Sequence, residues 1–163
     1  MSIAETLLPE FEQEMASTRR LLERVPSDKG TWKPHPKSFA LGHLAQLVSW
    51  MPGWIGNALR ENDLNLAAAP RYSFETTDKL LAIFDRGVQE SRDALKAARD
   101  ADFSATWSLR HGDKVLFSAP RSVIVRQHIS HLSHHRGQLT VYLRLLDVPI
   151  PPIYGPTADE RTW

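Results

Sequence analysis

The strongest constraint on the fold is the helical periodicity of four long segments, which are separated by loops rich in proline and glycine. Apolar residues recur at helical spacing over residues 3–25, 38–61, 76–99 and 120–146. The second segment has the broadest apolar set, which predicts a helix buried on more than one side. We therefore predict an all-α fold, a four-helix bundle that forms one domain over residues 1–163.

Prolines and capping residues suggest where these helices begin and bend. Ser38 is the candidate N-cap of the second helix, and Pro120 suits the first turn of the fourth. Pro9 interrupts the first segment, so we expect the start of that helix to shift toward it. Pro52 lies within the second segment and is expected to kink it.

The long connection between the third and fourth helices differs from the other loops. Residues 107–110 and 115–118 are rich in strand-forming side chains and flank the sequence His111-Gly-Asp-Lys114. This pattern predicts a short hairpin, although an irregular loop fits it equally well. We expect this connection to be the long crossover of the bundle. After residue 146 the proline-rich tail carries Ile153, Tyr154 and Trp163, which suggest that it packs on the helices.

Three histidines of the fourth segment lie on one helical face. His128, His131 and His135 share this face with Ile124 and Leu139, so we expect it to point into the core. Side chains at positions i and i+4, such as His131 and His135, are close enough to bind one metal ion. The alternative is that the three imidazoles are hydrogen-bonded core residues, but burying three of them would require several partners.

A metal site needs a third ligand from another helix. His43 lies near the start of the second segment, on a face with Leu47, Trp50 and Trp54, and is the natural candidate. His35 and His111 lie in loop and turn contexts and are weaker candidates. The chain has no cysteine, so any metal must be held by nitrogen and oxygen ligands.

Composition argues against several classes of function. The formal net charge of +1 and the lack of a basic stripe give no case for nucleic-acid binding. No stretch approaches the roughly 20 apolar residues of a membrane span. The N-terminus lacks the basic start and apolar run of a secretory signal, so we expect a cytoplasmic protein that does not bind membranes.

Three motifs together resemble the DinB/YfiT-like family of metalloenzymes, which is named for a DNA-damage-inducible protein. They are Leu41-Gly-His43-Leu, His131-Leu-Ser-His-His135-Arg-Gly-Gln138 and Leu143-Arg-Leu-Leu-Asp-Val-Pro149. The resemblance covers nearly the whole chain. It implies an up-down-down-up bundle, a divalent transition metal such as zinc or nickel, and a homodimer. It also implies that the three ligands are His43, His131 and His135.

The resemblance also implies the type of activity. Characterised members of the family include transferases that use low-molecular-weight thiols and a thiol-dependent isomerase. Between Phe103 and Ala158 the only acidic residues are Asp113 and Asp147. A metal hydrolase usually needs a carboxylate base, so this scarcity favours a thiol-dependent S-transferase, with an anionic thiol bound directly to metal, over a hydrolase. The alternative is a non-catalytic bundle that binds a metal or a small molecule in a stress response.

Further residues are expected to support the ligands or to line a substrate pocket. His128 shares the ligand face, and Arg136 and Gln138 adjoin the ligands in sequence. The aromatic candidates for the pocket are Trp50, Trp54 and Tyr142, although aromatic residues at helical spacing are more often simply core. Gly137 is expected to permit close packing against a neighbouring helix.

Overall fold

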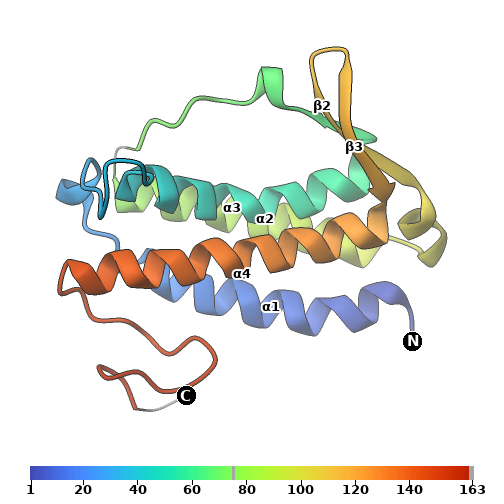
Figure 1. Cartoon of the computed structure of the whole chain (residues 1–163). Helices are drawn as coiled ribbons and strands as arrows, with labels where there is room; N and C mark the ends of the chain where they lie inside the picture. The colour runs from blue at the N-terminus through green and yellow to red at the C-terminus, as the bar shows by residue number, and fades with distance from the viewer. Residues whose placement is uncertain (75, 162–163) are drawn as a thin grey trace.

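Four α-helices form the body of the protein in the computed structural model, which describes residues 1–74 and 76–161. They are α1 (Ile3–Leu22), α2 (Leu41–Arg60), α3 (Thr77–Ala97) and α4 (Arg121–Leu145). Figure 1 shows that α1 and α4 run in one direction while α2 and α3 run in the other, as in an up-down-down-up bundle. The predicted helices are therefore present, each within a few residues of its expected bounds.

The all-α prediction was too narrow, because a small three-stranded sheet packs at one end of the bundle. Its strands are β1 (Asp63–Asn65), β2 (Thr106–His111) and β3 (Lys114–Pro120). β2 and β3 form the predicted hairpin, which turns at Gly112 with a φ of 59°. β1 adds to β2 in parallel and holds the hairpin turn, since the Asn65 side-chain oxygen accepts a hydrogen bond of 3.0 Å from the Gly112 amide.

The prediction of the long crossover was wrong. The segment that returns along the bundle between α2 and α3 is residues 61–74, which arches over both helices (Figure 1). Because α2 and α3 are parallel, the chain must travel back the length of a helix between them. α3 and α4 are antiparallel, so their connection stays at one end and folds there into the hairpin.

Two expected helix starts also differ from the structure. The Ser2 hydroxyl caps α1 by accepting from the Glu5 amide, and the Glu5 carboxylate accepts from the Ser2 amide, so the helix begins before Pro9. This reciprocal pair stabilises the first turn enough to tolerate the proline. α2 begins at Leu41 with Ala40 as its N-cap, rather than at Ser38.

α2 and α3 approach each other closely at Gly53 and Gly87. A Cβ atom on Gly87 would lie 2.9 Å from the Gly53 nitrogen, so only glycine allows this approach. One turn further along α3, the buried Ser91 hydroxyl donates to the Pro52 carbonyl at 2.5 Å and accepts from the Gly56 amide at 2.8 Å. The hydroxyl thereby satisfies backbone groups of α2 beside the proline.

A buried ion pair joins α4 to α1 and to the C-terminal tail. The Arg136 side chain is 1% exposed, and one of its amino groups lies 2.6 Å from the Glu14 carboxylate. The other amino group donates to the Glu14 carbonyl and to the Thr18 hydroxyl, each at 3.1 Å. The Tyr154 hydroxyl accepts from Arg136 at 2.7 Å and donates to Glu14, so the tail packs on the helices as predicted. Trp163 lies outside the described residues.

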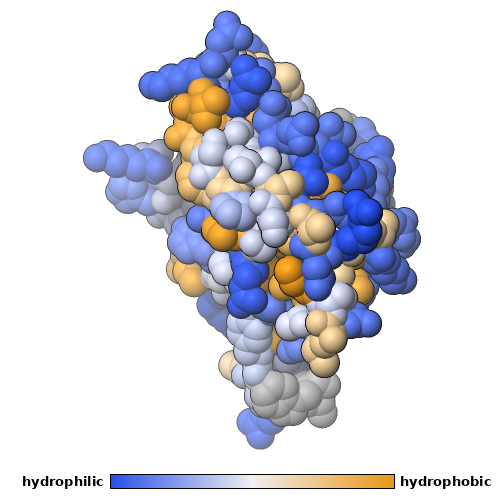
Figure 2. Space-filling model, turned by 90° about the vertical axis from the view of Figure 1, so that its right-hand side faces the viewer, coloured by the Kyte–Doolittle hydropathy of each residue, from blue (hydrophilic) through white to orange (hydrophobic). Residues whose placement is uncertain are grey.

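Seen from the hairpin end, the surface of the molecule has no single large apolar patch (Figure 2). Val115, Leu116 and Phe117 are exposed on β3. Figure 2, which views that end, shows hydrophobic side chains scattered among hydrophilic ones. Among the described residues, no helix combines the length and hydropathy that crossing a membrane requires.

We expect Arg136→Met to lower the free energy of unfolding by about 3–5 kcal/mol, because it leaves the Glu14 carboxylate buried without its cation. Urea unfolding would measure the change. The control is Arg20→Met, which removes an exposed ion pair with Glu160 and should cost less than about 1 kcal/mol. A double variant, Glu14→Leu with Arg136→Met, should regain most of the loss; equal losses in the single and double variants would contradict this account.

Two glycine-to-alanine substitutions should have opposite effects. Gly87→Ala should destabilise the protein by about 1–3 kcal/mol, because the new methyl group meets the α2 backbone. The structure places nothing within 4 Å of a Cβ on Gly137, so the expectation of close packing there was wrong. Gly137→Ala should therefore stabilise α4 by about 0.5–1 kcal/mol. Thermal unfolding of both variants would show it, and destabilisation by Gly137→Ala would refute it.

Candidate metal centre and adjoining cavities

Two histidines of α4 meet at their ring nitrogens. One helical turn separates His131 from His135, and their Nε2 atoms lie 2.9 Å apart. The two rings lie at the edge of the bundle rather than in its core, since His131 is exposed and His135 is half-buried. The expectation that their face points into the core holds only in part, because Ile124 and Leu139 of that face are buried while His131 is exposed, and the buried side of the helix also includes Leu132 and Arg136.

Gln138 fixes the proton on His135. Its side-chain oxygen lies 2.7 Å from His135 Nδ1, and its amide nitrogen lies 3.1 Å from His134 Nε2. An amide oxygen only accepts, so the neutral His135 ring carries its proton on Nδ1 and has its lone pair on Nε2. The lone pair therefore faces His131, which is the arrangement that a metal-binding imidazole needs.

His43 approaches the same region from α2 but is held in an aromatic stack. Its ring lies 4.4 Å from that of Phe39 and 3.6 Å from that of Tyr72, measured between centroids. Neither ring nitrogen of His43 forms a hydrogen bond with a described residue. Tyr142 of α4 donates a hydrogen bond to the carbonyl of Phe39, four residues before His43, so the start of α2 lies near the C-terminal part of α4.

The surroundings keep these three imidazoles neutral. Burial lowers the pKa of His43, and the nearby Lys33 ammonium lowers it further. Burial also lowers the pKa of His131, with His135 and His134 adding to the effect. For His135, burial lowers the pKa while the hydrogen bond to Gln138 acts in the opposite direction. Neutral imidazole is the form that binds a metal, so the site favours ligation near neutral pH.

The donor set matches a divalent transition metal only in part. His131 and His135 supply two converging nitrogens, and imidazole suits zinc and nickel. Within the described part of the chain, however, no group of three His, Asp or Glu side chains is gathered so that it could hold a metal ion. The structure therefore brings two of the predicted ligands together, while His43 is stacked between Phe39 and Tyr72.

A cavity of about 420 Å³ lies directly beside His131. His128 and Ile124 of α4, Trp54 of α2 and Trp107 of the hairpin form its walls. The centroid of the Trp54 ring lies 5.8 Å from that of His128 and 6.0 Å from that of His131, so this ring packs beside both histidines. His128 thus lines this cavity.

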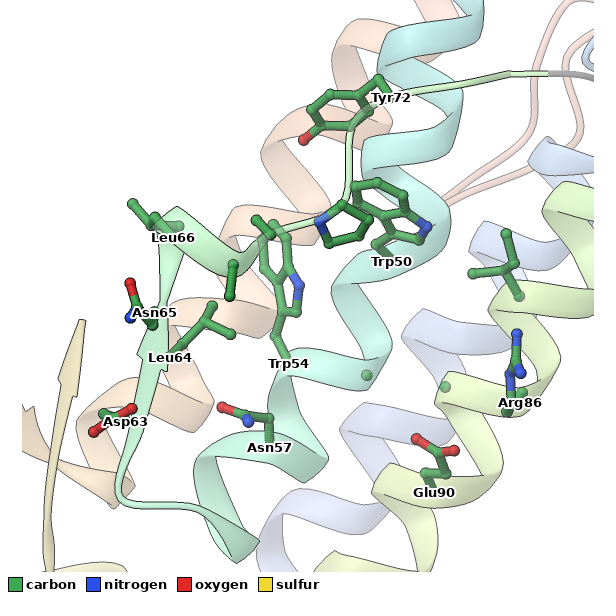
Figure 3. A pocket seen from close by; sticks show the side chains of 16 residues that line it. Trp50, Trp54, Asn57, Asp63, Leu64, Asn65, Leu66, Tyr72, Arg86 and Glu90 are labelled. Atoms are coloured by element: carbon green, nitrogen blue, oxygen red, sulfur yellow. The ribbon is translucent and has the colours of Figure 1, made fainter. Parts of the chain in front are cut away.

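A second cavity, of about 600 Å³, lies on the other side of Trp54. Figure 3 shows Trp50, Trp54 and Asn57 along α2, with Arg86 and Glu90 on the neighbouring α3. Leu64 and Leu66, from the segment between α2 and α3, line both cavities. Trp54 and these two leucines therefore separate one cavity from the other. Trp50 and Trp54 line this second cavity, whose wall contains none of the three predicted ligands.

Two of the predicted site residues lie elsewhere. Arg136 points toward α1, where Glu14 and Thr18 satisfy its guanidinium group. Tyr142 packs edge-on against Trp32, with 5.8 Å between ring centroids, and its hydroxyl donates to the Phe39 carbonyl. Arg136 therefore positions α4, and Tyr142 joins α4 to the segment that leads into α2.

Several residues of the site were not identified from the sequence. Tyr72 and Trp107 come from connections whose path depends on tertiary contacts, and no local pattern assigns them to the site. His134 did carry a signal, since Gln138 follows it by four residues and follows His135 by three, the spacings that allow side-chain contact on a helix.

Comparisons with known proteins agree with this architecture. The chain is 27% identical over 158 residues to the uncharacterized protein YrdA of Bacillus subtilis (strain 168), an alignment that covers 94% of this chain and 89% of that protein. Among solved structures, a DinB-like protein from Bacillus cereus has a TM-score of 0.72 at 20% identity, covering 92% of this chain and 97% of the other.

A second solved structure gives the same result. The DinB-like protein YjoA of Bacillus subtilis has a TM-score of 0.72 at 16% identity, covering 96% of this chain and 99% of that one. At these identities the structures establish a shared fold. The model of the DinB family matches residues 1–162, and the chain therefore belongs to the DinB family.

Proposed function

We propose that this protein is a metal-dependent enzyme in which His43, His131 and His135 hold a divalent transition metal, zinc or nickel. The observation that carries the proposal is the convergence of His131 Nε2 and His135 Nε2 at 2.9 Å, with Gln138 orienting the second ring. Histidines that only pack in a core would not require two ring nitrogens to converge near the surface. Three neutral imidazoles leave an open coordination position for a substrate.

Each residue has a defined task in this proposal. His131 and His135 provide two nitrogens from one helix, and Gln138 keeps the proton of His135 on Nδ1. His43 provides the third nitrogen when its ring turns out of the stack with Phe39 and Tyr72. Trp54 and the residues of the cavity beside His131 exclude water from one side of the site.

The surroundings favour thiol transfer over hydrolysis. A bound divalent metal lowers the pKa of a coordinated water or thiol. Hydrolysis would also need a base, but none of the described residues lining the cavity beside His131 is a carboxylate. Glu14 of α1, which also accepts a hydrogen bond from Ser133 of α4, is already engaged by Arg136 and Tyr154. A low-molecular-weight thiol is therefore the preferred substrate, in an S-transferase reaction.

The second candidate function is non-catalytic binding of a metal or a small molecule. The two cavities beside Trp54 favour it, because they would accept a ligand whether or not a reaction follows. Turnover of a thiol with an electrophile would distinguish an enzyme from such a binding protein. The homodimer and the cytoplasmic location stay predictions.

Elemental analysis of untagged protein should find about one zinc or nickel ion per chain. His43→Ala, His131→Ala and His135→Ala should each lose it, because two remaining imidazoles rarely retain a metal. Gln138→Leu should weaken binding by about 10–100-fold, since the orientation and basicity of His135 depend on this amide.

The matched control is His111→Ala, which removes an exposed histidine of the hairpin and should retain the metal. Circular dichroism would verify that all variants are folded. A folded wild-type protein that takes up no zinc, nickel or manganese after reconstitution would refute the proposal.

A further inference from the structure

Two residues in the wall of the cavity beside His131 carry a buried polar atom without a partner among the described residues. Trp107 is 2% exposed, and its Nε1–H group forms no hydrogen bond with any described residue. His128 Nε2 is likewise buried and unpaired among the described residues. The two rings meet edge to face, with centroids 6.0 Å apart, and both line this cavity.

Such atoms are expensive to leave unpaired. A buried donor or acceptor without a partner costs about 1–3 kcal/mol, so native structures contain few of them. Three other buried atoms, Asn57 Oδ1, Arg110 Nε and Arg121 Nε, also lack partners among the described residues, but none of these three residues lines the cavity beside His131. Two unpaired atoms in one cavity therefore mark a place where a ligand supplies the missing partners.

The remaining lining restricts the charge of that ligand. None of the ten described residues that form the cavity wall is an Asp, Glu, Lys or Arg. Burial lowers the pKa of His128 to about 4, so its ring is neutral near neutral pH. A charged ligand would lose its hydration here without gaining a counter-ion. By contrast, the cavity on the other side of Trp54 includes Asp63, Arg86 and Glu90.

We propose that this cavity binds an uncharged, aromatic or otherwise apolar co-substrate, which accepts a hydrogen bond from Trp107 Nε1–H and pairs with His128 Nε2. This inference rests on the proposed function, because it assigns to the thiol the metal position and to the second reactant the space beside His131. A volume of about 420 Å³ suits a small organic molecule. Trp54, Leu109 and Phe117 offer apolar and aromatic surfaces for its body.

Binding can be tested with a matched pair of probes that do not react. 1,3-Dinitrobenzene is neutral and carries hydrogen-bond acceptors, while 3,5-dinitrobenzoate adds one negative charge to the same body. Isothermal titration of the full chain, with and without added zinc, should show binding of the neutral probe. In the metal-free protein the anion should bind at least about tenfold more weakly, because its charge has no partner in the cavity.

Three variants assign the binding to this cavity. Trp107→Phe keeps an aromatic ring but removes the N–H group, and should weaken binding of 1,3-dinitrobenzene by about five- to tenfold. Trp32→Phe is the control, since Trp32 packs on Tyr142 away from the cavity and the substitution should leave the affinity unchanged. Leu109→Trp should fill the cavity and abolish binding. Thermal unfolding would verify that each variant is folded.

The outcomes separate this inference from the proposed function. A protein that takes up zinc but binds neither probe, or binds both equally, would overturn the inference and leave the metal proposal intact. Binding of the neutral probe by a protein that takes up no metal would support the cavity and overturn the enzyme proposal. Equal affinities of folded Trp107→Phe and Trp32→Phe for the neutral probe would overturn the inference about the cavity. So would a crystal grown with the probe in which Trp107 Nε1–H bonds only to an ordered water.

Discussion

The buried contact between Arg136 and Glu14 determines how α4 is rotated in the bundle. Removing two charges from water costs several kcal/mol, which their attraction and added hydrogen bonds must offset. Arg136 meets this requirement only when its guanidinium faces Glu14, Thr18 and Tyr154 together. A rotation of α4 by one residue would strand the charge. The contact therefore specifies one orientation of the helix, in which His131 lies beside Trp54 of α2 and His135 follows one turn later.

The position of α2 depends on its contact with α3. Gly53 and Gly87 let the two backbones approach, and the Ser91 hydroxyl occupies backbone groups of α2 next to Pro52. Trp50 and Trp54 flank this contact on α2. Because the helix is held there, the Trp54 ring stands between the two cavities and against the histidines of α4. A proline that the sequence analysis treated as a kink thus has a packing partner on the next helix.

Local patterns predicted the elements but not the contacts between them. Periodicity identified the four helices, and the spacing of His131 and His135 implied that their rings meet, since both features follow from helix geometry. β1 was missed because a three-residue strand is defined by its pairing with β2 and has no pattern of its own. Arg136 and His43 were assigned from sequence proximity and helix faces. Their contacts with Glu14 and Tyr72 join residues that lie far apart in the sequence, and no local pattern predicts them.

The distribution of charge connects the fold to the proposed chemistry. Arg136 and Glu14 form their ion pair between α1 and α4. The cavity beside His131, also on α4, has no Asp, Glu, Lys or Arg among its described lining residues. A low-polarity space beside a cluster of neutral imidazoles strengthens any electrostatic interaction formed within it, because little water is present to screen it. An anionic thiolate would therefore be stabilised mainly by a metal held at His131 and His135. The uncharged wall of Trp54 and Trp107 would receive a neutral partner. The same lining disfavours hydrolysis, because that reaction would need a carboxylate base and the cavity wall has the indole rings of Trp54 and Trp107 instead.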